Sequence, residues 1–178
     1  ELMNKVLNEE MKKLIEEINK ILDESDKEKL KSLLESLDSE NSDLEKELDR
    51  ELELFKQLEF EQKFEEALDK ISELKNQQEN LKIETEKNSQ KNQELSKKQE
   101  DINNKMTDVK KDLEDLRKKN MELENKTNLP QTKELEKTIT KNMQNSQDNL
   151  QKNLKKKSVK SQKNAISDLE KLMEELKT

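Results

Sequence analysis

Residues 74–127 read LKNQQENLKIETEKNSQKNQELSKKQEDINNKMTDVKKDLEDLRKKNMELENKT, and this stretch decides the expected fold. One column of residues, spaced seven apart, is apolar at every position except Asn88. Its members are Leu74, Leu81, Asn88, Leu95, Ile102, Val109, Leu116 and Leu123. A repeat of seven places these side chains along one stripe of an α-helix, the pattern typical of a coiled coil. The stretch therefore predicts a heptad rod over residues 75–127 that packs against another helix.

The second column of the same heptad is mostly polar. Its members are Gln78, Thr85, Asn92, Gln99, Met106, Leu113, Asn120 and Thr127. A strong two-stranded coiled coil is apolar in both columns. Asn88, Asn92 and Asn120 either specify a parallel dimer or mark places where the helix is unpaired. We therefore expect a weak, hydrated helix–helix seam, whose apolar members are Leu81, Leu95, Ile102, Val109, Leu113, Leu116 and Leu123.

A single proline follows the heptad rod. Pro130 is expected to end the long helix, because it biases Leu129 away from helical backbone angles, and Thr132 is suited to cap a new helix. Residues 133–178 then carry apolar residues in two successive phases. Folded back on the rod, they would supply the apolar contacts that the polar column lacks. We therefore expect an antiparallel helical hairpin that turns at residues 128–132, with a straight, proline-kinked helix as the alternative.

The first 74 residues predict an acidic helical bundle that runs into the rod. A broad apolar stripe indicates a first helix from Leu2 to about Leu22, and acidic and serine-rich segments follow at 23–26 and 38–42. Each segment begins a capping-box pattern, Ser25 with Glu28 in one case and Ser42 with Glu45 in the other, so true turns are expected there. Because neither segment contains glycine or proline, continuous helix is the alternative.

One apolar face follows the second of these segments. Its members, which point the same way from a helix, are Leu44, Leu48, Leu52, Phe55 and Leu58. All three phenylalanines fall between residues 55 and 64, and their bulk predicts the packing junction between bundle and rod, at Phe55, Phe60 and Phe64.

Composition excludes most enzyme classes. The 178 residues include no glycine, histidine or cysteine, and 44% of them are charged. Without these residues there is no glycine-rich phosphate loop, no conventional zinc site and no Cys–His or Ser–His–Asp catalytic group. Neighbouring carboxylates such as Glu16 and Glu17 do not share a helix face, so they are read as solvated surface. We expect an all-α protein that is not an enzyme and that has no cofactor, no metal and no small-molecule substrate.

Charge is unevenly distributed along the chain. Residues 1–73 carry 12 Lys and Arg against 24 Asp and Glu, whereas residues 128–178 carry 11 against 7. The basic residues of the C-terminal part concentrate in one run. That run contains Lys152, Lys155, Lys156, Lys157, Lys160 and Lys163. It is suited to an anionic lipid surface, a nucleic acid or an acidic helix, with a solvated lysine-rich face as the alternative. Since no aromatic residue interleaves the run, base stacking has no support and nucleic acid is the weaker expectation.

Three segments carry a resemblance to a known family. They are ELMNKVLNEEMKKLIEEI at 1–18, ELELFKQLEFEQKF at 51–64 and KSVKSQKNA at 157–165. Together they resemble an uncharacterised family of large, membrane-anchored, mostly helical envelope proteins of Bacteroidota. The resemblance implies a periplasmic location on the outer side of the inner membrane, with transmembrane helices upstream of this region, and it brings no catalytic residues. A cytoplasmic location is the alternative.

These observations predict a structural role. The apolar pattern begins at Leu2 and continues to Leu176, so we expect a region of a longer chain. The expected function is a coiled-coil scaffold that assembles with itself or with another envelope protein. The alternative is a regulatory binding module whose lysine-rich C-terminal helix binds an anionic surface.

Overall fold

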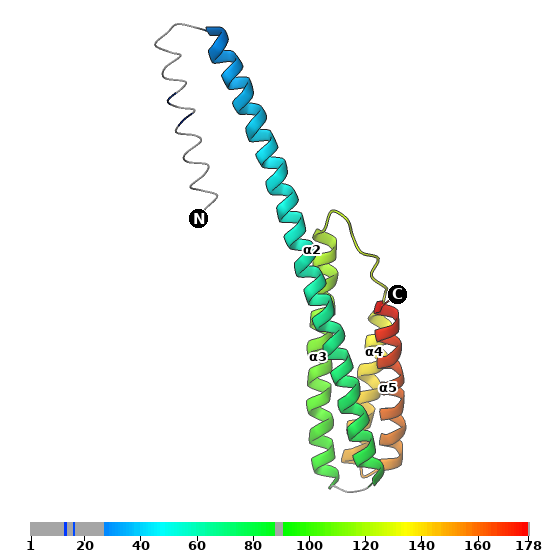
Figure 1. Cartoon of the computed structure of the whole chain (residues 1–178). Helices are drawn as coiled ribbons and strands as arrows, with labels where there is room; N and C mark the ends of the chain where they lie inside the picture. The colour runs from blue at the N-terminus through cyan, green and yellow to red at the C-terminus, as the bar shows by residue number, and fades with distance from the viewer. Residues whose placement is uncertain (1–12, 14–15, 17–26, 88–90, 178) are drawn as a thin grey trace. The chain divides into compact units, whose positions relative to one another are not determined.

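The computed structural model describes residues 27–87 and 91–177, together with the single positions 13 and 16. The described residues form helices and no strand, which confirms the all-α fold class (Figure 1). The helices are α2 (Lys27–Lys87), α3 (Asn92–Glu122), α4 (Lys133–Gln151) and α5 (Lys155–Lys177). The chain divides into two compact units, residues 1–52 and residues 53–178. The first part of α2 belongs to the first unit, and the rest of α2 belongs to the second with α3, α4 and α5.

Residues 53–178 form an antiparallel four-helix bundle. Between α2 and α3, Lys119 contacts Glu59 at 2.8 Å and Lys98 contacts Glu84 at 2.7 Å, so residue numbers rise along one helix as they fall along the other. The same reversal relates α3 to α4, α4 to α5 and α2 to α5. Each helix therefore packs against the two next to it in an up–down–up–down order (Figure 1).

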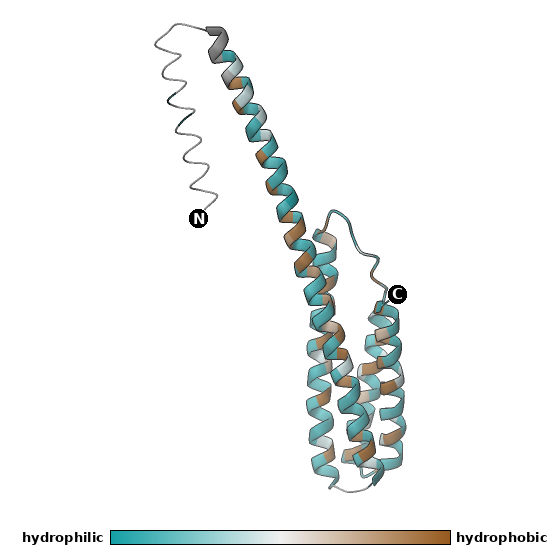
Figure 2. Cartoon of the chain, viewed as in Figure 1, coloured by the Kyte–Doolittle hydropathy of each residue, from teal (hydrophilic) through white to brown (hydrophobic). Residues whose placement is uncertain are grey.

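The bundle has one continuous apolar core. Apolar residues are sparse along each helix, as Figure 2 shows, and those that face inward are almost fully buried. The core contains Phe60, Ala67, Ile71, Leu74, Leu81, Leu95, Ile102, Met106, Val109, Leu113, Leu116, Leu123, Ile139, Met143, Leu150, Ala165, Leu169, Leu172 and Leu176. Burial of these side chains supplies the main favourable free energy of folding.

The turn expected at 38–42 is wrong. Helix α2 runs through these residues without interruption, and the capping pattern of Ser42 and Glu45 starts no new helix. The segment contains no glycine or proline, and its polar side chains are exposed, so they do not prevent the helix from continuing. The first expected turn, at 23–26, and the first expected helix, at 2–22, lie outside the described residues.

The continuous rod expected over 75–127 is also wrong. Helix α2 ends at Lys87, α3 begins at Asn92, and residues 88–90 lie outside the described part. The exact heptad across this gap does not require one helix, because two helices that turn toward each other keep the same apolar residues on their facing sides. Leu81 and Leu95 are 2% and 0% exposed in the shared core. The antiparallel arrangement buries them both.

The chain turns earlier than the proline. Helix α3 ends at Glu122, where Leu123 takes an extended conformation while its side chain stays buried. Asn120 then holds the connecting segment by two hydrogen bonds with the backbone of Thr127, at 2.7 and 2.8 Å. Asn120 is therefore a loop-stabilising residue. Neither the parallel-dimer interpretation nor the unpaired interpretation describes it.

The returning segment is two helices instead of one. Helices α4 and α5 are joined at residues 152–154, where Asn153 has a φ of 58°. Asparagine tolerates this left-handed conformation better than most residues. The backbone N–H of Leu154 donates to the carbonyl of Asn149 at 2.7 Å, which closes the end of α4. The change of apolar phase in the sequence corresponds to this turn.

Candidate interaction surfaces

A layer of buried polar side chains crosses the bundle core. Gln78 of α2 and Gln99 of α3 donate to each other's side-chain carbonyls, at 3.1 and 2.7 Å. Ser146 of α4 donates to Gln99 at 2.7 Å and lies 2.8 Å from Ser158 of α5. Gln162 of α5 points its amide toward the same layer. Every helix of the bundle thus contributes to one hydrogen-bonded layer.

This polar layer contains part of the mostly polar heptad column. Gln78, Thr85 and Gln99 were expected in a hydrated seam, and all three are buried between helices of the same chain. The amides of Gln78 and Gln99 pair with each other, and the Thr85 hydroxyl donates to the carbonyl of Leu81 at 2.7 Å. The Gln162 side-chain oxygen, in contrast, is buried without a hydrogen-bond partner among the described residues. A buried polar group is costly unless it finds a partner, so the layer favours the one alignment of four helices that satisfies it.

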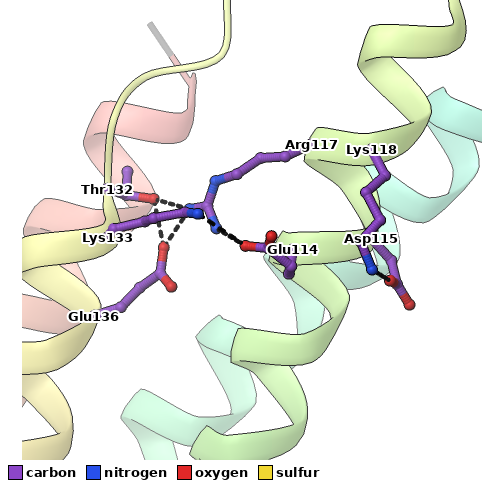
Figure 3. A network of polar contacts seen from close by, with 7 residues as sticks. All are labelled: Glu114, Asp115, Arg117, Lys118, Thr132, Lys133 and Glu136. Carbon is purple, nitrogen blue, oxygen red and sulfur yellow. Dashed lines mark hydrogen bonds and ion pairs between the residues drawn. The ribbon is translucent and has the colours of Figure 1, made fainter.

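A second polar cluster lies where α3 meets the start of α4. Arg117 donates to the Thr132 hydroxyl at 2.7 Å and forms a buried ion pair with Glu136 (Figure 3). Thr132 donates to Glu136 at 2.7 Å, so its hydroxyl serves this cluster and makes no capping bond to α4. Lys133 lies 3.2 Å from Glu114, and this hydrogen-bonded cation lowers the pKa of the Glu114 carboxyl. The polar groups of this cluster are paired with one another, and these contacts hold the end of α3 against the start of α4.

The expected helix–helix seam is buried within the chain. Leu81 comes from α2, Leu123 follows the end of α3, and the other members lie on α3. Every member is at most 5% exposed. These members are Leu81, Leu95, Ile102, Val109, Leu113, Leu116 and Leu123. The folded bundle therefore uses the seam internally and leaves none of it for a partner.

The expected phenylalanine junction divides into two parts. Phe60 is buried, and its ring stacks on that of the half-buried Phe64, with centroids 6.2 Å apart. Phe55 is 68% exposed. Phe60 therefore belongs to the core of the four-helix bundle, Phe64 packs against that core, and Phe55 is not part of it.

The lysine run gathers around the turn between α4 and α5. Lys152 lies in the turn, and Lys155, Lys156 and Lys157 form the first residues of α5, where the helix dipole adds partial positive charge. Lys160 is exposed on the following turn, and Lys163 is 3.3 Å from Glu86 of α2.

The two adjoining helices bring further polar groups to this end of the bundle. Lys155 and Lys156 line one shallow pocket with Thr85 of α2, and they line another with Asn92 of α3. Asn92 itself donates to Asn153 in the α4–α5 turn, so this core-column asparagine ties two turns together within the chain. The lysine run therefore forms one basic surface at this end.

The first part of α2, residues 27–52, presents an apolar face of another kind. Five leucines of α2 share one side of the helix at spacings of three, seven, four and four residues, and brown bands along the first part of α2 mark apolar residues in Figure 2. Leu34, Leu44, Leu48 and Leu52 are 50%, 44%, 54% and 53% exposed, and Leu37 is half-buried. We call these five residues the leucine stripe. From the sequence, Leu44, Leu48 and Leu52 were expected on one face of a packed bundle, and Leu34 and Leu37 were expected on a separate short helix before the turn at 38–42. Nothing in the sequence indicated that these residues stay exposed.

Comparison with known proteins identified no relative of this chain. No protein-family model, curated protein or solved structure matches this chain. Within the described residues, no helix has the length and apolar character needed to cross a membrane. In the same residues, the acidic side chains form no group suited to hold a metal ion.

Proposed function

We propose that this chain is a non-enzymatic scaffold region that acts by helix–helix assembly, with the leucine stripe as its contact surface. The observation that carries this proposal is the exposure of about half of each of four leucines on one helix face. Contiguous exposed apolar surface of this kind marks sites where proteins bind one another. Leucines repeated at helical spacing fit the apolar face of a second helix.

Leu54, Phe55 and Leu58, which follow the leucine stripe along α2, are 59%, 68% and 51% exposed. The other exposed large apolar residues of the described bundle are scattered, unlike the stripe. Ile83, Met121 and Leu154 are 41%, 69% and 39% exposed, and each belongs to a different part of the bundle. They are too far apart in sequence to form a helical repeat. Single exposed apolar residues are normal on protein surfaces, whereas a repeat along one face is suited to a partner helix.

The test uses three designed or natural binding partners. These are an amphipathic peptide with lysines beside its apolar face, a matched peptide with glutamates in their place, and a second copy of the chain. At least one is expected to bind the full chain, and the variant Leu44→Gln/Leu48→Gln/Leu52→Gln is expected to weaken that binding at least about tenfold. The control variant is Ile83→Gln/Met121→Gln/Leu154→Gln. If none of the three binds in a manner that depends on the stripe, the proposed function is wrong.

The same proposal includes a location. The resemblance to membrane-anchored envelope proteins supports a place on the periplasmic side of the inner membrane, with a cytoplasmic place as the alternative. Cell fractionation, together with labelling of intact cells by a reagent that does not enter the cytoplasm, distinguishes the two.

A second candidate function rests on the basic surface at the α4–α5 turn. Lys155, Lys156 and Lys157 stand together at the start of a helix, which favours an anionic partner. Binding to vesicles with and without phosphatidylserine, measured against salt concentration, tests this function. Replacement of the three lysines by glutamine is compared with the same replacement at Lys126, Lys141 and Lys177. Binding that is insensitive to salt, or equal in both variants, would remove this candidate.

A further inference from the structure

The leucine stripe is bordered by acidic residues on both sides. A helix turns by 100° per residue, so residues three, four and seven apart share a side. One border contains Asp38, Glu45 and Asp49, and the other contains Glu40, Glu47 and Glu51. All six residues are exposed. The basic residues Lys46 and Arg50 lie on the opposite face of the helix, where Lys46 contacts Asp43 at 3.0 Å. Lys31, seven residues before Asp38, lies on the first border and is 4.0 Å from Glu35, so the six acidic residues flank the part of the stripe from Leu37 to Leu52.

The six acidic residues form no ion pair with the part of the chain that the structure describes. Among the described residues, none of the six lies within ion-pair distance of a lysine or arginine. From Leu37 to Leu52, the charges that border the leucine stripe are therefore all negative and form no ion pair among the described residues. We call these six residues the acidic borders.

In the four-helix bundle of the same chain, ion pairs between helices lie beside the buried apolar contacts. Where α2 packs on α3, Lys70 contacts Asp112 at 2.7 Å, and Lys119 contacts Glu59 at 2.8 Å. Where α2 packs on α5, Lys75 contacts Glu170 at 2.9 Å. Buried apolar contacts in this protein are thus bordered by opposite charges on the two helices.

We propose that the leucine stripe binds an amphipathic helix whose own apolar face is bordered by lysines or arginines. This inference rests on the proposed function, since it names the partner of the same surface. A basic helix would place a cation opposite each acidic border, as α3 and α5 do for α2. Residues beside the apolar columns set partner choice in paired helices through such charge pairs.

A second copy of the stripe is the wrong partner by the same reasoning. In a parallel pair, Glu40 of one copy would face Glu45 of the other. In an antiparallel pair, each border would face its own equivalent. Both arrangements bring carboxylates together, and like charges at these positions disfavour pairing. The lysine-rich helix α5 is no alternative, because Ala165, Leu169 and Leu172 on its apolar face are fully buried in the bundle.

The experiment measures binding of four probes to the full chain by fluorescence anisotropy. The first peptide has four heptads with leucine in both core columns and lysine at both borders. The second is identical except for glutamate at the borders. The third is the segment ELMNKVLNEEMKKLIEEINKIL, residues 1–22 of this chain, in which four lysines and five glutamates nearly balance. The fourth probe is a labelled copy of the chain itself.

We expect the lysine peptide to bind at least about tenfold more tightly than the other three probes at low salt. The advantage should shrink as the ionic strength rises from about 0.01 M to about 1 M, because salt screens exposed charges. The variant Leu44→Gln/Leu48→Gln/Leu52→Gln should lose the binding, and Ile83→Gln/Met121→Gln/Leu154→Gln should keep it. Circular dichroism establishes that both variants retain their helices.

A charge-reversed variant provides the independent test. Asp38→Lys, Glu40→Lys, Glu45→Lys and Glu47→Lys together should make the glutamate peptide the tighter ligand, with the leucines unchanged. Binding that depends on the stripe but favours the glutamate peptide, the 1–22 peptide or self-association would overturn the inference and leave the proposed function standing. Equal binding of the lysine and glutamate peptides would overturn it as well. Absence of stripe-dependent binding by every probe would overturn both.

Discussion

The two units of this chain use the same kind of sequence for opposite outcomes. In residues 53–178, the leucines of the core are almost fully buried, and charges of opposite sign meet across the helix contacts. In residues 27–52, leucines at similar spacing are about half exposed, and from Leu37 to Leu52 the charges beside them are all negative. The difference teaches that apolar spacing identifies a contact face, whereas the bordering charges indicate what the face contacts.

Replacement of a core leucine gives the largest expected contrast between the units. Leu95→Ala removes a side chain that is 0% exposed and should lower the free energy of unfolding by about 4 kcal/mol. Leu48→Ala, at 54% exposure, should change it by less than about 0.5 kcal/mol. Urea denaturation followed by circular dichroism measures both values. Equal losses would mean that the stripe is packed in the protein as it exists in solution.

The buried ion pair between Arg117 and Glu136 gives the next largest effect. Glu136→Ala leaves the guanidinium without its buried carboxylate and should cost about 3 kcal/mol of unfolding free energy. Glu134→Ala is the matched control, because Glu134 is on the same helix turn and its side chain is 85% exposed in a pair with Lys137. That control should change stability by less than about 0.5 kcal/mol. A cost as small for Glu136 as for Glu134 would contradict the burial of this pair.

The polar layer predicts an effect that depends on how many of its members are replaced. Gln99→Leu alone should cost about 2 kcal/mol, because Gln78 and Ser146 lose a buried partner. Replacement of Gln78, Gln99 and Gln162 together by leucine should recover much of that loss, since fewer polar groups then remain unpaired. Chemical denaturation of the single and triple variants tests this coupling. Additive losses would show that the three amides do not form one layer.

The smallest expected effect is on how the free energy of unfolding changes as the pH falls. Hydrogen bonds from Lys119 and Lys133 lower the pKa of the Glu59 and Glu114 carboxyls from the ordinary value of 4.5. A carboxyl whose pKa is lower in the folded state contributes stability above its unfolded pKa and loses it as the pH falls through the folded pKa. The double variant Glu59→Gln/Glu114→Gln should therefore lose less stability than the natural chain between neutral pH and acid.

The side chains of Glu59 and Glu114 are 53% and 47% exposed, so water screens their ion pairs and the change in pH dependence should be small. Glu65→Gln, which replaces another exposed carboxylate of α2, serves as the control and should leave the pH profile of unfolding nearly unchanged. A larger effect from this control than from the double variant would contradict the two inter-helix ion pairs.

Much of the fold was predictable from local pattern. Helical spacing of apolar residues and the absence of glycine indicated long helices, and the heptad column correctly identified residues that need a partner helix. Turn positions were less predictable. The serine and acidic residues at 38–42 matched a capping pattern, yet no tertiary contact requires a turn there, and the helix continues. In contrast, no strong breaker occurs between Lys87 and Asn92, where the chain does change helices.

The candidate surfaces were predictable in part. The lysine run could be recognised from the local lysine content of the sequence, and the structure places it around the turn at Asn153. There asparagine takes the left-handed φ that glycine usually adopts. In the sequence, the polar layer could be seen only as polar residues, such as Gln78 and Gln99, at positions of the heptad that are usually apolar. Because Gln99 meets residues from three other helices, no local pattern identifies its partners.

The sequence by itself determined that this chain is helical, which residues seek burial and where charge concentrates, because these follow from residue type and from a periodicity of 3.6. Tertiary structure decided which helices bury one another. It assigned the heptad column to the inside of a four-helix bundle and left the leucine stripe exposed. The physical reason is that burial depends on a partner distant in sequence, and the same periodic pattern serves equally well for a partner within the chain or outside it.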